Sequence, residues 1–198
     1  MNRLSTLICA MLYTGLAAFA NPATAQVLTP DQKTEVEALR EGEMRKLIVH
    51  SEPEDLPAEP YLDKDGGEIR ISESNGSIRL VNFWATWCAP CRVEKPSLDA
   101  LQQDMGGPEF EVIAIATGRN DLAGIDRFNE EYGITALATR LDPKSKLAQA
   151  THVRGLPVTI LVNREGQEIG RLTGGADWNS DSAKAIITYL TELEGQTG

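Results

Sequence analysis

Residues 79–91 read RLVNFWATWCAPC, and the rest of the predicted fold is built around this stretch. The run over residues 79–85 is apolar and rich in β-forming side chains, which predicts a buried strand. Cys88 and Cys91 follow at once, with two residues between them. Residues 92–105 then carry apolar side chains at helical spacing, and two glycines and a proline end the run. The order of strand, cysteine pair and helix therefore places Cys88 at the N-terminus of a helix.

That position gives Cys88 a specific chemistry. Unpaired N–H groups and the positive end of the helix dipole stabilise a thiolate relative to a thiol. Such sites lower a cysteine pKa from ~8.5 into the range ~3.5–7.5. We expect Cys88 to face solvent and Cys91, one turn later, to be shielded behind it. Cys88 would then attack a disulfide, and Cys91 would resolve the mixed disulfide that forms.

Two other uses of such a pair stay open on the residues alone: half of a zinc site, and a plain structural disulfide. A structural zinc site needs four ligands, usually from two such pairs, and the sequence contains no second pair. The redox interpretation needs no cofactor beyond a redox-active Cys88–Cys91 disulfide, and we expect no bound metal.

Composition narrows the class further. The 198 residues are 41% hydrophobic and 24% charged, which is typical of a globular protein. The formal net charge is −10, and the sequence has no long cluster of Lys and Arg. Because binding to nucleic-acid phosphates needs such a cluster, we expect no nucleic-acid partner. Three cysteines are too few for a disulfide-stapled miniprotein, and two histidines cannot supply a His-rich metal site.

The first 25 residues have the pattern of a secretory signal peptide. Arg3 provides the positive start, residues 4–20 are apolar, and small residues occupy the positions before Gln26. We expect cleavage before Gln26 and export to the periplasm. Cys9 would leave with the peptide, so that the Cys-x-x-Cys pair alone remains. The alternative is an uncleaved segment that anchors the protein in the inner membrane.

The remaining chain divides into an N-terminal extension, residues 26–58, and a main domain, residues 59–198. In the extension, Thr29-Pro30-Asp31 has the pattern of a helix start, and we predict a helix over residues 35–47 and an extended connector over residues 52–60. Further strands are predicted over residues 68–71, 110–116, 135–141, 158–162 and 168–173, and further helices over residues 121–132, 143–150 and 181–193. This alternation predicts an α/β fold with a mixed central sheet flanked by helices. The side chains expected inside the sheet are Val81, Phe83, Ile113, Ile115, Ile160 and Val162.

The run from Val81 to Arg92, followed by Glu94 and Pro96, closely resembles the TlpA/ResA-like group of thioredoxin-fold proteins. The sequence Gly155-Leu156-Pro157-Val158-Thr159 resembles the cis-proline segment of that group. The resemblance implies that residues 59–198 form a thioredoxin-like domain with a cis Pro157 beside Cys88. It also implies a central helix–strand insertion, which would include residues 121–141.

The same resemblance implies a function. Members of this group are exported or membrane-anchored thiol:disulfide oxidoreductases, and many act as reductants. Their tasks include cytochrome c maturation and assembly of the copper centre of cytochrome oxidase. The implied partners are a client protein with a disulfide or a CxxC motif and a membrane-embedded electron donor.

Glu94 lies three residues after Cys91, where this group often carries an acid. A partly buried carboxylate with a raised pKa would shuttle a proton to or from Cys91. The alternative is a solvated helix residue paired with a nearby Arg or Lys. Ordinary thioredoxin carries a buried acid where this chain has Asn82, which cannot titrate.

Trp87 is expected on the client-facing surface, and Trp178 is expected to pack against other side chains near the C-terminal helix.

Three other functions are alternatives for a cysteine pair of this kind. A disulfide-forming oxidant would use the same cysteine pair at a higher reduction potential. A copper carrier would use both cysteines as soft ligands with His152 as the third, although a lone His is more often an ordinary polar residue. A related peroxidase would carry Thr where this chain has Ala85, three residues before Cys88.

Overall fold

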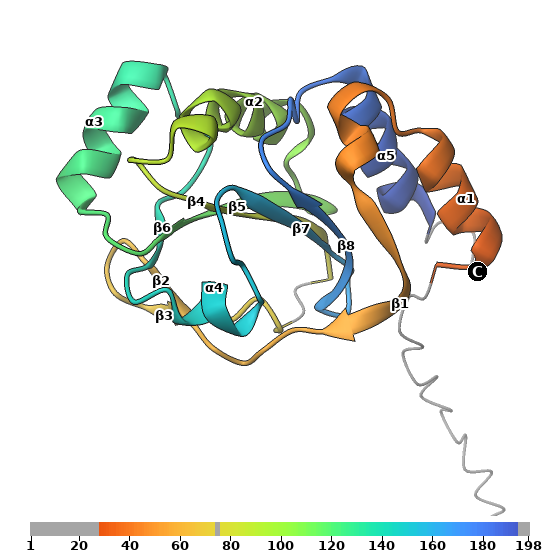
Figure 1. Ribbon diagram of the computed structural model, residues 1–198, viewed down its shortest axis with the longest axis horizontal. Helices are drawn as coiled ribbons and strands as arrows, with labels where there is room; N and C mark the ends of the chain where they lie inside the picture. Colours follow the sequence, from red (N-terminus) through yellow and green to blue (C-terminus); the bar gives the residue numbers. More distant parts are fainter. Residues whose placement is uncertain (1–27, 74–75, 194–198) are drawn as a thin grey trace, which may run out of the picture.

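The computed structural model describes residues 28–73 and 76–193 (Figure 1). The expected signal peptide or anchor, its cleavage site and Cys9 lie outside these residues. The helices are α1 (Pro30–Ala38), η1 (Gly42–Lys46, a 3₁₀ helix), α2 (Ala89–Met105), α3 (Leu122–Tyr132), α4 (Lys146–Ala150) and α5 (Asp181–Glu192). The strands are β1 (Ile48–Asp55), β2 (Tyr61–Asp63), β3 (Glu68–Ile69), β4 (Ile78–Trp84), β5 (Phe110–Thr117), β6 (Arg140–Asp142), β7 (Val158–Val162) and β8 (Gln167–Thr173).

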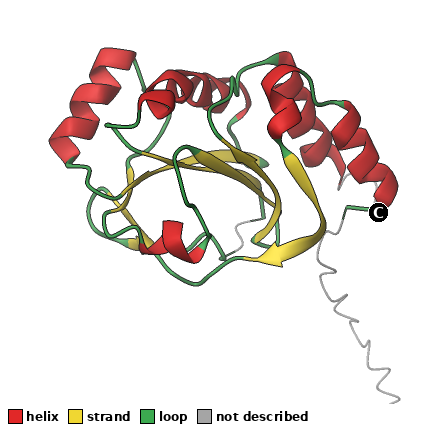
Figure 2. Ribbon diagram, viewed as in Figure 1, coloured by secondary structure: helices red, strands yellow, loops and turns green. Residues whose placement is uncertain are grey.

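These strands form one mixed sheet in the order β1-β8-β7-β4-β5-β6-β2-β3. At its centre, β4 pairs in parallel with β5 and antiparallel with β7. Helices α1, α2, α3 and α5 cover one face, whereas α4 lies on the other (Figures 1 and 2). The predicted α/β class, with a mixed sheet flanked by helices, is confirmed.

Strand β4 is buried along its whole length because both faces of the sheet are covered. Alternate side chains enter different cores: Leu80 and Trp84 pack on the side of α2, and Val81 and Phe83 pack on the side of α4. The six side chains predicted to lie inside the sheet are all buried: Val81, Phe83, Ile113, Ile115, Ile160 and Val162.

The central insertion is present as α3 followed by β6, but its strand is shorter than predicted. Residues 135–139 are irregular, and the strand covers only Arg140–Asp142. The physical reason lies on α2, where Asp99 Oδ1 accepts hydrogen bonds from the backbone N–H groups of residues 135, 136 and 137. Those donors are therefore not available to a neighbouring strand.

The N-terminal extension departs from its prediction in two ways. The helix start at Thr29-Pro30-Asp31 is confirmed, because Thr29 caps α1, but the helix over residues 35–47 is wrong: α1 ends at Ala38, and η1 follows. The connector predicted from residue 52 is in part the strand β1, which pairs antiparallel with β8. A Cβ on Gly170 of β8 would lie 2.9 Å from the carbonyl oxygen of Ile48, so only glycine permits this close approach.

Smaller differences occur near the sheet edge and around α4. The strand predicted over residues 68–71 covers only Glu68–Ile69, and β2 was not predicted. Helix α4 starts at Lys146 rather than at residue 143, because residues 143–145 form a turn and Ser145 has φ +54°. Among the described residues, no helix combines the length and the apolar character needed to cross a bilayer.

Candidate active site

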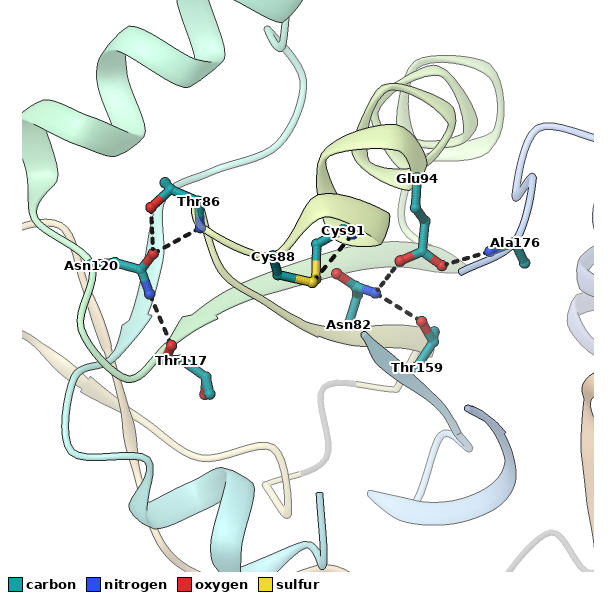
Figure 3. Close-up of a disulfide and its surroundings, with 9 residues drawn as sticks. All are labelled: Asn82, Thr86, Cys88, Cys91, Glu94, Thr117, Asn120, Thr159 and Ala176. Atoms are coloured by element: carbon teal, nitrogen blue, oxygen red, sulfur yellow. Dashed lines mark hydrogen bonds between the residues drawn. A yellow bond between two sulfur atoms is a disulfide. The ribbon is translucent and has the colours of Figure 1, made fainter. Parts of the chain in front are cut away.

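Cys88 lies where β4 has ended and α2 begins. It is the N-cap of α2, and its Sγ accepts a hydrogen bond from the backbone N–H of Cys91 at 3.3 Å. Cys88 and Cys91 form a disulfide with their Cα atoms 5.3 Å apart (Figure 3). Pro90 lies in the first turn, where its missing N–H leaves no intrahelical bond unmade. The local sequence thus presents a sulfur to the free amides of a helix N-terminus.

Both cysteines are buried, and Cys91 is the more deeply buried of the two. Cys91 is 1% exposed and lies behind Cys88, as predicted. Cys88 is only 6% exposed, so the expectation that it faces open solvent is wrong. It instead forms part of the wall of a pocket of about 540 Å³, together with Trp87, Pro90 and Leu156. A client must enter this pocket to reach Cys88.

The Leu156–Pro157 peptide bond is cis, as the resemblance implied. Strand β7 begins at the next residue, Val158, which pairs with Phe83 of β4. Gly155 and Leu156 line the same pocket as Cys88. The segment that ends in Pro157 therefore lies beside the disulfide, although the two are far apart in the sequence.

Glu94 projects from α2 into the protein interior and is 2% exposed. Its Oε1 accepts hydrogen bonds from Trp178 Nε1 at 2.6 Å and from the backbone N–H of Ala176 at 3.2 Å. Its Oε2 accepts one from Asn82 Nδ2 at 3.1 Å (Figure 3). No ion pair to Glu94 is present among the described residues, and the solvated-surface alternative is wrong.

Burial dominates the electrostatics of Glu94 and raises the pKa of its carboxyl group to about 7. The hydrogen bonds from Trp178, Asn82 and Ala176 act in the opposite direction, as does the positive charge of Lys46. A carboxyl group with a pKa near neutrality exchanges a proton readily at physiological pH. Such a group, one turn from Cys91 on the same helix, has the property expected of a proton carrier.

Several groups that complete this site were not predicted for it. Asn82 Nδ2 also donates to Thr159 Oγ1 at 2.9 Å, which joins β4 to β7 beneath the disulfide. Trp178 packs in the core, as predicted, but its indole N–H also binds Glu94. A buried indole needs a hydrogen-bond acceptor, and that need is the signal by which sequence reasoning could have linked the two residues.

The segment before Cys88 is held by the loop after β5. Asn120 Oδ1 accepts hydrogen bonds from the backbone N–H and the hydroxyl of Thr86, and Asn120 Nδ2 donates to the carbonyl of Thr117 (Figure 3). Trp87 Nε1 donates to the carbonyl of Arg119 at 3.2 Å, yet the Trp87 residue is 64% exposed. Trp87 therefore lies at the surface beside Cys88, as predicted.

Lys95 is a second buried ionisable group near the pair, and it was not predicted. Its Nζ lies 3.7 Å from the centre of the Trp84 ring, a cation–π contact. Burial lowers the pKa of Lys95 to about 7, while the charge of Asp99 acts to raise it. Glu94 and Lys95 are neighbours in sequence but contact different residues.

His152 is exposed, follows α4 and is not among the residues lining the pocket that contains Cys88. Across residues 28–73 and 76–193, no group of three or more His, Cys, Asp or Glu side chains is arranged to hold a metal ion.

Residues 53–167, more than half of the chain, match the model of the AhpC/TSA family. The chain belongs to the AhpC/TSA family. This AhpC/TSA-family chain is 32% identical to the thiol-disulfide oxidoreductase ResA of Bacillus subtilis over 124 residues. These residues make up 63% of this chain and 68% of ResA. It is 38% identical over 116 residues to the thiol:disulfide interchange protein HelX of Rhodobacter capsulatus, 57% of this chain and 63% of HelX. The chain thus spans about two thirds of the length of these relatives.

Solved structures agree on the fold. A putative thiol:disulfide interchange protein DsbE from Chlorobium tepidum superposes with a TM-score of 0.60 at 23% identity, covering 70% of this chain and 96% of that one. StoA from Bacillus subtilis gives a TM-score of 0.54 at 20% identity, covering 67% and 98%. The thioredoxin fold and the resemblance to ResA-like proteins are confirmed. With its cysteine pair and these relatives, this family member is a thiol:disulfide oxidoreductase.

Proposed function

We propose that this oxidoreductase is exported and reduces disulfides in client proteins, with Cys88 as the attacking thiolate. The observation that carries the proposal is the position of Cys88 as the N-cap of α2, where its sulfur accepts the Cys91 N–H. The same hydrogen bond and the helix dipole would stabilise a negative charge on Cys88 after reduction of the pair.

The reaction transfers two electrons by two exchanges. The Cys88 thiolate attacks one sulfur of the client disulfide, and the other client sulfur leaves as a thiolate. Cys91 then loses its proton and attacks Cys88 Sγ, which breaks the mixed disulfide and releases the second client thiolate. The client gains two electrons, and the oxidoreductase ends as the Cys88–Cys91 disulfide.

Glu94 is proposed to accept the Cys91 proton in the second exchange and to return it when the pair is reduced again. Its raised pKa and its burial one turn from Cys91 support this role. Pro157 is proposed to position the client: Gly155 and Leu156, which precede it, line the pocket at Cys88, where an extended client segment would pair with the backbone.

The clients are proposed to belong to cytochrome c maturation or to assembly of the cytochrome oxidase copper site, as the ResA-like resemblance implies. Electrons would come from a membrane-embedded donor. The N-terminal pattern of residues 1–25 supports a periplasmic location, either released or anchored to the inner membrane.

The direction of transfer can be tested by the reduction potential of the Cys88–Cys91 pair in the full chain. A value well below about −200 mV supports a reductant, whereas a value near about −120 mV is that of a strong oxidant and would reverse the proposal. A parallel assay follows reduction of insulin disulfides in the presence of a thiol donor. Cys88→Ser should abolish that turnover, and unchanged turnover would contradict the assignment of Cys88.

A further inference from the structure

The loop between β8 and α5 contacts α2 at Pro90 and Glu94. Gly175 of this loop faces Pro90, and a Cβ on Gly175 would lie 3.6 Å from the Pro90 carbonyl oxygen. Ala176 donates its backbone N–H to Glu94, and Trp178 donates its indole N–H. Two of the three hydrogen bonds that the Glu94 carboxyl group accepts therefore come from this loop.

The N-terminal extension holds the same loop on both sides of Ala176. Lys46 Nζ, from η1, donates to the carbonyl oxygen of Gly175. Glu43 Oε2, from the same 3₁₀ helix, accepts the backbone N–H of Asp177 at 2.8 Å. Glu43 and Lys46 also pair with each other, with 3.4 Å between Oε1 and Nζ. One ion pair thus holds the residues before and after Ala176.

We propose that Glu43 and Lys46 are positioning residues for Glu94, acting through the loop whose Ala176 N–H and Trp178 indole bind its carboxyl group. The inference rests on the proposed function in taking Glu94 as the proton carrier of the exchange reaction. It extends that function by making the N-terminal extension part of the active site.

The charges around Glu94 support this assignment. Lys46 of η1 is close enough to Glu94 for its charge to act on the carboxyl group. Two acids, Glu43 of η1 and Asp177 of the loop, line a pocket of about 600 Å³ together with Glu94. On its own helix the neighbouring cation, Lys95, lies over Trp84 instead. From β4 it meets only the neutral Asn82. Lys46 is therefore the positive charge that lowers the pKa of Glu94 against the effect of burial.

Loss of the ion pair would act on Glu94 in two ways that reinforce each other. Removing the Lys46 charge favours the protonated carboxyl group, because one nearby positive charge is lost. Releasing the loop weakens the hydrogen bonds that favour the carboxylate. A smaller fraction of Glu94 would then be ionised at neutral pH, so fewer molecules could accept a proton from Cys91. The Lys46 and Glu43 side chains are 42% and 55% exposed, so their substitution removes little buried structure.

The test compares three variants of the full chain: Lys46→Met, Lys46→Arg and Lys33→Met. Lys33 is the matched control, because it belongs to the same extension but donates to Ser51 Oγ at 2.9 Å, away from the loop. The pKa of Glu94 is measured by carbon-13 NMR of glutamate-labelled protein, with the Glu94 signal identified by its loss in Glu94→Gln. The pH profile of disulfide exchange is measured alongside.

Lys46→Met should raise the pKa of Glu94 by about half a unit or more and move the exchange profile to higher pH by the same amount. Lys46→Arg should restore both, and Lys33→Met should change neither. An unchanged pKa in Lys46→Met, or an equal rise in Lys33→Met, would overturn the inference. The NMR titration does not depend on activity, so it distinguishes this failure from a failure of the proposed function, in which Glu94→Gln would leave the exchange profile unaltered.

Discussion

Asn82 Nδ2 donates a hydrogen bond to Glu94 Oε2 at 3.1 Å, which places a side chain that cannot titrate against the buried acid of the site. The acid itself is on α2, in the turn after Cys91, and the strand β4 supplies only a donor. The proton transfer proposed above would therefore depend on a single carboxyl group, held by groups from β4 and from the loop before α5.

Replacing that donor by a second acid should change the titration of the site. In Asn82→Asp, two carboxyl groups about 3 Å apart cannot both ionise easily, so the upper apparent pKa of the pair should rise above that of Glu94 alone. The check is the pH profile of disulfide exchange. Asn82→Ser is the neutral control and should give no second titration; identical profiles for the two variants would contradict the prediction.

Glu94 should make the protein less stable as the pH rises. Its folded pKa of about 7 lies above its ordinary value of 4.5, so between these values the folded state binds more protons than the unfolded state. The free energy of unfolding should therefore fall across this window, by about 3 kcal/mol if the full shift is expressed. Urea titrations of the oxidised protein at pH 4.5 and pH 8 should show this fall, and Glu94→Gln should largely remove it. A fall of equal size in Glu94→Gln would assign it to other groups.

Lys95 should have the opposite effect at higher pH. Its folded pKa of about 7 lies below its ordinary value of 10.5, so the unfolded state binds more protons in this window and stability should increase with pH. Lys95→Met should flatten this increase and stabilise the protein at pH 7, while its side chain still packs on Trp84. Lys184→Met, at a surface lysine paired with Asp104, should leave the increase intact; thermal unfolding from pH 7 to 9.5 measures both.

Trp178→Phe deletes the 2.6 Å hydrogen bond to Glu94 and keeps most of the aromatic packing. Because that bond favours the carboxylate, the pKa of Glu94 should rise further, and the exchange profile should move to higher pH. Trp87→Phe is the comparison, since its indole binds Arg119 at the surface. The idea fails if the two substitutions move the profile equally.

Cys91→Ser should stop the reaction at the mixed disulfide, because nothing remains to resolve it. The expected product is a covalent adduct between Cys88 and the client that a reducing agent releases, seen by non-reducing electrophoresis and identified by mass spectrometry. Cys88→Ser leaves Cys91 as the one cysteine of the described residues; Cys91 is 1% exposed, so this variant should capture no client there. Equal adduct yields from the two variants would show that the order of attack is wrong.

The sequence was sufficient for the part of the site that is local in the chain. A strand, a cysteine pair and a helix follow one another within residues 78–105, so periodicity alone places Cys88 at the helix N-terminus. The cis bond before Pro157 was predicted from a resemblance, because an isolated proline does not reveal its isomer.

What escaped prediction depends on contacts between distant segments. Glu94 was named as a partly buried acid from the resemblance, but its donors Asn82, Ala176 and Trp178 lie up to 84 residues away and were not predicted. Strand β1 was missed for a related reason. Its single proline, Pro53, and its acids oppose strand formation, and pairing with β8 overrides that local preference.

The pairing of β1 with β8 has a practical consequence for anyone shortening this protein. The family match begins at residue 53, inside β1 (Ile48–Asp55), so a chain trimmed to the match would lose the residues that pair with Arg171 and Gly170. The backbone amides and carbonyls of β8 would then be open to another molecule's strand, which invites aggregation. A soluble fragment therefore has to begin upstream of Ile48.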